Sequence, residues 1–372
     1  MIAMPFYLHS AGLGAGLLFF LLSMILAADA AVLTHRLRIM GPNTYVALMR
    51  KAVGPKGEIL AVACVLLAGW GSAVAWIKFI GDNLARFLPF HLPSQGYIAI
   101  VMMPLFCCAW VDEITVLERF SYMGLLAGQL FVILLVILAT PHWEEFPSYL
   151  AAQPFLRYKS FPVAMGLAVF CNEGLVVMSP EVSASMSHPE TFAISVALAV
   201  TYFSVNYLLM SLCGDFLYSY VAHDAVAQEV TLSSAFTVTP THQAMVLCYV
   251  LQLLLTFPSS LFVMFRNVEQ LGAGSWCNSH FTHFRRSACG GRCWRVVLIL
   301  SFSAVAMVLP RFGDFLAVFG ALANSLCIYI LPHWAFSKDA SHGRKFTSWL
   351  VMLVFGLCCG GLAAVVSLQK LF

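Results

Sequence analysis

The residue best placed to do chemistry in this sequence is a carboxylate in the middle of an apolar segment. Glu173 lies in Phe170-Cys171-Asn172-Glu173-Gly174, and Ser179-Pro180 follows, so the segment is rich in groups that interrupt a helix. An interrupted helix exposes backbone amides and carbonyls that bind an ion or a carboxylate, and burial favours the protonated form of a Glu side chain. We interpret Glu173 as part of a substrate or ion site; a structural hydrogen bond is the alternative.

Other charged groups in apolar segments have simpler interpretations. Lys78 and Asp82 are four residues apart, on one face of a helix, where pairing removes the cost of burying each charge. We expect a structural ion pair. Asp29 is expected to be solvated or to cap the stretch Arg36–Arg38, and Asp314 is expected to cap the start of a helix.

One loop combines residue types that bind zinc, but their spacings match no standard zinc site. They are Cys277, His280, His283, Cys289 and Cys293. We expect a solvated loop, and the sequence predicts no metal and no organic cofactor. No Ser-His-Asp arrangement or phosphate-binding loop stands within the apolar segments, so we do not expect an enzyme.

The composition requires a lipid environment. Of 372 residues, 61% are hydrophobic and only 10% are charged, whereas soluble domains carry about 25% charged residues. The net charge of +3 is too small and too dispersed to indicate a nucleic-acid partner. The chain is therefore expected to be an all-α integral membrane protein whose partner is the lipid bilayer.

A helix needs about 20 apolar residues to cross the hydrocarbon, and fewer where neighbouring protein shields its ends. We expect ten spans in a single transmembrane domain covering residues 1–372, with a short stub before the first span. The spans are Gly12–Leu33, Leu60–Leu84, Tyr97–Val111, Tyr122–Thr140, Pro162–Val177, Ile194–Leu212, Ala244–Phe265, Val296–Leu309, Phe315–Trp334 and Trp349–Val366.

Basic residues gather in alternate loops, which predicts the orientation of the chain. The connection Gly214–His242 has no Lys or Arg and is expected to face away from the cytosol. The first full span then runs from outside to inside, which predicts a preceding span. The loops expected in the cytosol hold 14 of the 20 basic residues: Arg36, Arg38, Arg50, Lys51, Lys56, Arg119, Arg266, Arg285, Arg286, Arg292, Arg295, Lys338, Arg344 and Lys345.

The interrupted segment resembles the sixth helix of the amino acid/auxin permease family. The similarity extends from Phe170 through Ser179-Pro180-Glu181 to Met186, His188-Pro189 and Phe192. Further resemblances follow along the chain. Thr256-Phe257-Pro258 through Glu269 is similar to the eighth helix, Phe312 through Gly320-Ala321 to Ile330-Leu331-Pro332 resembles the tenth, and Ala3 to Leu13 resembles the end of the first helix and the start of the second.

This resemblance implies a LeuT-like fold, with two inverted repeats of five helices and an eleventh helix, in which broken helices one and six form the site. It assigns Met4, Pro5 and Phe6 to the first site helix and Phe170, Cys171, Asn172, Glu173 and Gly174 to the second. Because Met1 falls where the family is halfway through helix one, we expect a truncated first helix, without the unwound glycine segment.

The resemblance implies a secondary active transporter of amino acids, coupled to H⁺ or Na⁺ and working by alternating access. The alternative is a non-transporting paralogue or a membrane nutrient sensor that retains the fold. We expect a multi-pass protein of the plasma membrane or of a vacuolar or lysosomal-type membrane. The sequence selects neither the amino acid, the coupling ion nor the oligomeric state.

Overall fold

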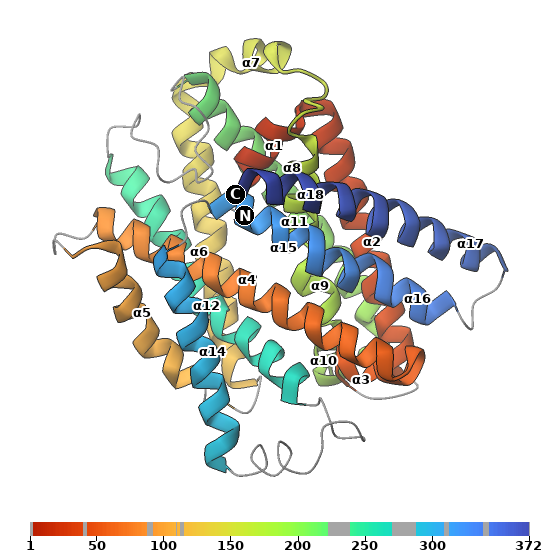
Figure 1. Cartoon of the computed structure of the whole chain (residues 1–372). Coiled ribbons are helices and arrows are strands. Elements are labelled where there is room, and N and C mark those ends of the chain that lie inside the picture. Colours follow the sequence, from red (N-terminus) through yellow and green to blue (C-terminus); the bar gives the residue numbers. More distant parts are fainter. Residues whose placement is uncertain are drawn as a thin grey trace.

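The computed structural model is a bundle of helices in which each expected span coincides with a helix or a run of helices (Figure 1). The structure describes residues 3–39, 43–87, 92–108, 110–111, 115–221, 239–269, 288–308, 312–337 and 342–371. Those parts of the chain contain helices, turns and bends and no strand. The protein is an all-α membrane protein, as the composition predicted.

The helices follow one another with short connections. They are α1 (Met4–Ala11), α2 (Leu13–Ile39), α3 (Tyr45–Val53), α4 (Pro55–Phe87), α5 (Ser94–Cys108), α6 (Thr115–Ala139), η1 (Thr140–Glu145), α7 (Phe146–Ala152), α8 (Phe161–Phe170), α9 (Glu173–Val177), α10 (Ser179–Ser185), η2 (Pro189–Thr191), α11 (Phe192–Asp215), η3 (Phe216–Val221), α12 (Pro240–Glu269), α14 (Ala288–Val308), α15 (Phe312–Phe319), η5 (Gly320–Asn324), η6 (Leu326–Ile330), α16 (Leu331–Ser337), α17 (His342–Val351), η7 (Met352–Cys359) and α18 (Gly360–Leu371).

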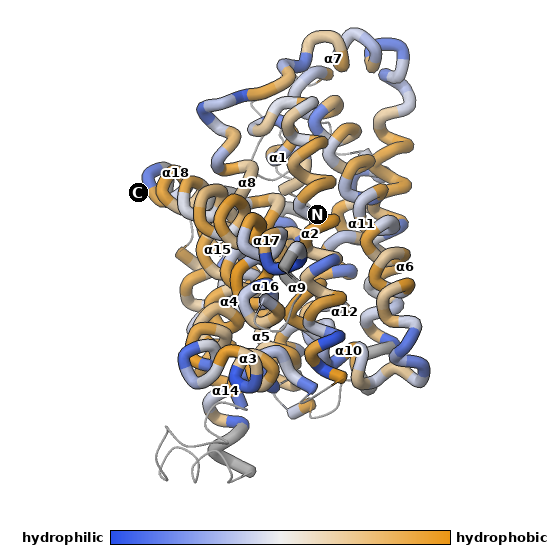
Figure 2. The backbone as a smooth tube through the Cα atoms, turned by 90° about the vertical axis from the view of Figure 1, so that its right-hand side faces the viewer, coloured by the Kyte–Doolittle hydropathy of each residue, from blue (hydrophilic) through white to orange (hydrophobic). Residues whose placement is uncertain are grey.

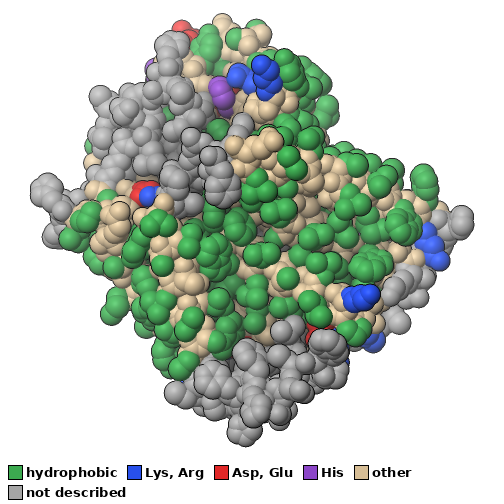
Figure 3. All heavy atoms as spheres, viewed as in Figure 1, with side chains coloured by type: hydrophobic (Ala, Val, Ile, Leu, Met, Phe, Trp, Pro, Cys, Tyr) green, Lys and Arg blue, Asp and Glu red, His purple; other side chains and the backbone are tan. Residues whose placement is uncertain are grey.

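Eight stretches of the described chain are long and apolar enough to cross a membrane. They coincide with eight of the ten expected spans, and the other two expected spans correspond to α5 and α14. Figure 2 shows hydrophobic backbone through the middle of the bundle and hydrophilic segments near α7 at one end and near α3 and α10 at the other. On the face shown in Figure 3, hydrophobic side chains cover the centre. This band is the surface that lipid would contact.

The helices around the interrupted segment approach one another very closely. α8 packs against α1, α15 and α18, and α15 continues into the π-helical segment η5. A Cβ atom built at Gly320 would overlap the carbonyl oxygen of Gly166, and one built at Gly166 would overlap that of Ala317. The absence of side chains at Gly166 and Gly320 thus lets two backbones touch, which is how small residues act at membrane helix interfaces.

The predicted ion pair between Lys78 and Asp82 is confirmed, with 3.0 Å between Nζ and Oδ1. Asp29 differs from expectation: its Oδ1 lies 2.6 Å from Nη2 of Arg344 on α17, so the carboxylate joins two distant helices instead of capping its own. The side chain of Asp314 lies outside the described residues. So do those of the Cys/His loop, except that of Cys293, which is exposed.

Candidate functional site

The predicted interruption of the apolar segment is confirmed at Cys171 and Asn172. α8 ends at Phe170, α9 begins at Glu173, and the two residues between them form a turn. The amide nitrogen of Asn172 donates to the carbonyl of Val169 at 3.1 Å, three residues back instead of four. The carbonyl of Ala168 accepts instead from the side-chain Nδ2 of Asn172, at 3.2 Å. A side chain therefore supplies a bond that the helix backbone no longer makes.

The start of α1 lies directly against this break. Sγ of Cys171 is 3.4 Å from Sδ of Met4, so the two segments that the family resemblance assigned to the site are in contact. Met4 is 1% exposed, Pro5 is buried and Phe6 is half-buried. Pro5 occupies the first turn of α1 and packs on Gly214 of α11, where any Cβ would overlap the proline ring. α1 is thus held between the break and α11.

A chain of three polar side chains ties the break to two other helices. Nδ2 of Asn172 donates to Oγ of Ser23 on α2 at 2.8 Å, and that oxygen is 2.7 Å from the hydroxyl of Tyr329 in η6. All three side chains are buried. Because membrane interiors offer no water to such groups, this chain fixes the break relative to α2 and η6.

The contacts also settle which way the Asn172 amide points. The carbonyl of Ala168 can only accept, so the group facing it must be the donor Nδ2. The other amide atom, Oδ1, is buried and has no partner among the described residues. A buried acceptor without a hydrogen bond costs about 1–3 kcal/mol. Oδ1 of Asn172 is therefore an acceptor positioned to receive a donor or a cation.

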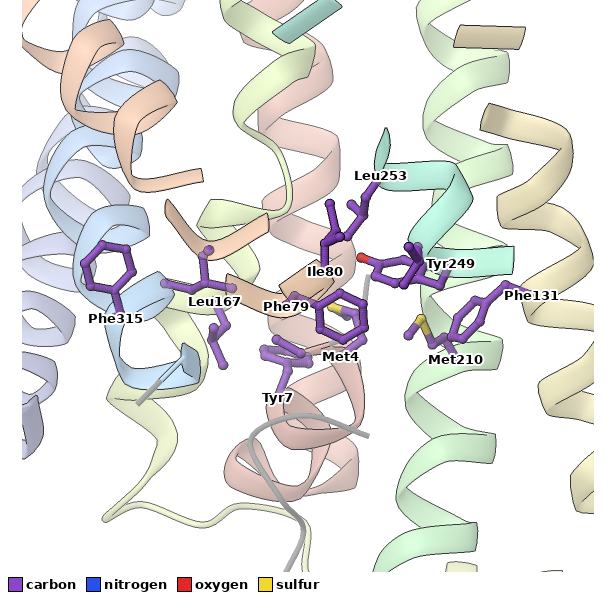
Figure 4. Close-up of a cluster of buried hydrophobic side chains, with 14 of the residues drawn as sticks. Met4, Tyr7, Phe79, Ile80, Phe131, Leu167, Met210, Tyr249, Leu253 and Phe315 are labelled. Carbon is purple, nitrogen blue, oxygen red and sulfur yellow. The ribbon is translucent and has the colours of Figure 1, made fainter. Parts of the chain in front are cut away.

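Aromatic and sulfur-containing side chains surround α1 near the break. Figure 4 shows Met4 and Tyr7 of α1 within a buried cluster that includes Phe79 of α4, Met210 of α11 and Tyr249 of α12. The hydroxyl of Tyr7 donates to the carbonyl of Gly16 at 2.5 Å. The site thus combines a few polar groups with an apolar, polarisable lining, which is typical of small-molecule sites.

The remaining predicted residues lie on either side of the turn. Phe170 is half-buried, and its Cβ would be 2.8 Å from a Cβ built at Gly320, so it packs on η5. Gly174 is exposed, and a Cβ there would have only Sδ of Met178 nearby, at 3.7 Å. The backbone of Glu173 starts α9, but its side chain lies outside the described residues. The role predicted for that carboxylate stays a prediction.

Sequence reasoning missed Ser23 and Tyr329. A serine inside an apolar helix usually bonds to its own backbone, and the buried tyrosine carries no local signal. Their hydroxyls meet although they are 306 residues apart in the chain. The only hint lies in polar types at otherwise apolar positions of two predicted spans.

Comparison with known proteins places this geometry in context. The sequence profile of a family described as "Transmembrane amino acid transporter protein" matches residues 1–372. The chain is 25% identical to amino acid transporter ANT1 of Arabidopsis thaliana over 338 residues, 87% of this chain and 75% of that protein. It is 23% identical to amino acid transporter AVT1E of the same plant, covering 88% of this chain and 62% of the relative. Vacuolar amino acid transporter 2 of Saccharomyces cerevisiae is 23% identical, with 96% and 76% covered.

Proposed function

The chain belongs to the transmembrane amino acid transporter family, and on this premise we propose that it carries amino acids across a membrane by secondary active transport. The observation that carries the proposal is the break at Cys171–Asn172 lying against α1, with Met4 and Cys171 in contact. Broken helices that face one another are where transporters of this kind bind their solutes. The names of the relatives, amino acid transporters all, support the substrate class.

The substrate would lie between α1 and the break, with Met4, Pro5 and Phe6 on one side and residues 170–174 on the other. Oδ1 of Asn172 would accept a hydrogen bond from the substrate's ammonium group, or bind Na⁺ as a carbonyl-type oxygen ligand. Ser23 and Tyr329 would hold the amide in this orientation, since Nδ2 is already occupied. Met4 and Cys171 would contact apolar parts of the substrate.

Transport would require the site to open alternately to the two sides. Met4, Ser23, Asn172 and Tyr329 are all buried in the described conformation, so a substrate reaches Asn172 only if α1, α9 or the helices around them move. A proton or Na⁺ would drive the cycle, with Glu173 binding the proton or supporting the broken helix. The inverted repeat within a single transmembrane domain would provide the two symmetry-related states.

Uptake in cells tests this proposal. A panel of labelled amino acids is offered to transporter-deficient cells that express the chain, with external pH and Na⁺ varied and membrane abundance matched. We expect saturable uptake of at least one amino acid, and we expect Glu173→Gln to abolish it or to remove its dependence on pH.

The matched control is Asp82→Asn, which removes a carboxylate that pairs with Lys78 away from the break. It should retain uptake. If the wild-type chain reaches the membrane and moves no amino acid, the alternative of a non-transporting sensor with the same fold replaces transport.

A further inference from the structure

Asp215, at the last position of α11, is a buried carboxylate in an unfavourable place. Its side chain is 1% exposed, and it lies at the negative end of the helix dipole. Its Oδ1 is 3.1 Å from Nδ1 of His9 on α1, and its Oδ2 accepts from the hydroxyl of Tyr149 on α7 at 2.8 Å. An ionised carboxylate in such surroundings needs a positive partner nearby. His9 is the group in direct contact that can become positive.

The protonation state of His9 in this arrangement follows from its other neighbour. Nη1 of Arg157 is 3.4 Å from Nε2 of His9. A guanidinium only donates hydrogen bonds, so Nε2 must carry the lone pair and Nδ1 the proton that is donated to Asp215. His9 is therefore neutral here, and it connects the positive Arg157 to the negative Asp215.

The surroundings of this cluster hold few other titratable groups. Of the residues that the structure describes, those recorded as facing His9 or Asp215 are Tyr149 of α7 and Arg157 of the segment before α8, with Cys213 of α11 close to Tyr149. None of them is a second carboxylate. Of these groups, His9 is the one whose ordinary titration lies near neutral pH.

We propose that His9, held between Asp215 and Arg157, is a proton-binding site of this protein, separate from the helix break. Nε2 of His9 would take a proton from water and become a donor, so its bond with Arg157 would break and the two positive charges would repel. The other ring nitrogen would keep its hydrogen on Asp215, now as a full ion pair. Binding of a proton thus strengthens the link from α1 to α11 and weakens the link from α1 to Arg157.

This exchange of partners has a mechanical consequence because α1 also carries part of the break. The segment before α8 is attached to the end of α1 by the amide of Arg157 on the carbonyl of Ala11, at 3.0 Å, and by Oγ of Ser160 on the carbonyl of Ser10, at 2.7 Å. Losing the Arg157 side chain from His9 removes the charged contact of that attachment. α1, with Met4 against Cys171, is then held mainly by α11.

The location suits a proton taken from outside the cytosol. His9, Tyr149 and Arg157 lie near α1 and α7, at the end of the bundle opposite α3, whose Arg50 and Lys51 mark the face expected in the cytosol (Figure 1). The role of this proton in coupling rests on the proposed transport function, whereas the binding of the proton does not.

Hydrogen–deuterium exchange on the purified full chain in lipid nanodiscs tests the site without requiring transport. Exchange of residues 153–160 is compared at about pH 7.5 and about pH 5, on either side of the ordinary titration of histidine, after correction for the intrinsic rate. In the wild type we expect faster corrected exchange at the lower pH. His9→Gln should lose this dependence, Arg157→Gln should exchange fast at both values, and Asp82→Asn should behave as the wild type.

Equal corrected exchange at both pH values in the wild type, or an unchanged response in His9→Gln, would overturn the proposal. Arg157→Gln provides an independent reading if His9→Gln does not fold, because it leaves His9 in place. Uptake assays separate this proposal from the previous one: a pH response without uptake supports the proton site and removes the transport function, and uptake without the response does the reverse.

Discussion

Nδ2 of Asn172 lies 2.8 Å from Oγ of Ser23, and this bond joins the interruption between α8 and α9 to the first long helix of the bundle. The same amide group donates to the carbonyl of Ala168, so its nitrogen is fully engaged and its oxygen is free to bind something else. A hydrogen-bonded turn in the middle of a bundle would be costly without such anchoring. The site is consequently built from a side chain that both stabilises the break and presents an acceptor.

Asn172→Ala should reduce amino acid uptake by about tenfold or more, because a hydrogen bond to a charged group contributes about 1.5–3 kcal/mol. Saturation kinetics at matched membrane abundance would measure the loss. Asn206→Ala is the control, since Asn206 is also a buried asparagine with an unpartnered Oδ1, but its Nδ2 bonds to Tyr202 within α11. Equal losses in the two variants would count against a binding role for Asn172.

Tyr329→Phe should raise the KM of uptake, because the loss of its hydroxyl frees Ser23 and lets the Asn172 amide turn. The comparison is Tyr45→Phe, whose buried hydroxyl donates to the carbonyl of Cys327 at 2.7 Å. Both variants should lose about 0.5–1.5 kcal/mol of stability, the usual contribution of one hydrogen bond. Only the first should change KM; a change of equal size in both would show a general effect of destabilisation.

The sequence predicted the break and the ion pair of Lys78 with Asp82 because both are local. Helix-interrupting residues act on their own segment, and a pair four residues apart shares a helix face. It did not predict the partner of Asp29, Arg344, or the meeting of Ser23 with Tyr329, because these contacts depend on how distant helices pack. The inverted repeat, although implied by the family resemblance, stays a prediction.

Gly320→Ala should destabilise the protein, because the added methyl group would overlap the carbonyl oxygen of Gly166 and a backbone atom cannot turn aside. Overpacking of this kind costs about 1–3 kcal/mol. Thermal unfolding of the detergent-solubilised protein would report it. Gly361→Ala is the matched control in α18, where nothing lies within 4 Å of the new Cβ. An unchanged melting temperature for Gly320→Ala would contradict the close backbone approach.

Glu269→Gln should cost more stability than Asp29→Asn. Oε1 of Glu269 lies 2.6 Å from Nη2 of Arg295, and the two side chains are 19% and 6% exposed. Removing one partner of a buried pair costs about 3–5 kcal/mol, because the other charge is left uncompensated. The Asp29 and Arg344 side chains are 34% and 39% exposed, where a pair contributes about 1 kcal/mol or less.

Thermal unfolding of both variants beside the wild type would rank them. If Asp29→Asn proved the more damaging, the exposures of these two pairs would have to differ from those described.

Transport by the purified chain alone tests the central claim most directly. The protein is reconstituted into liposomes preloaded with an unlabelled amino acid, and entry of the labelled form is followed for wild type, Asn172→Ala and Asn206→Ala. We predict exchange by the wild type and by Asn206→Ala that saturates with substrate, and little exchange by Asn172→Ala. Absence of exchange by folded, correctly inserted wild-type protein for every amino acid tested would contradict the account.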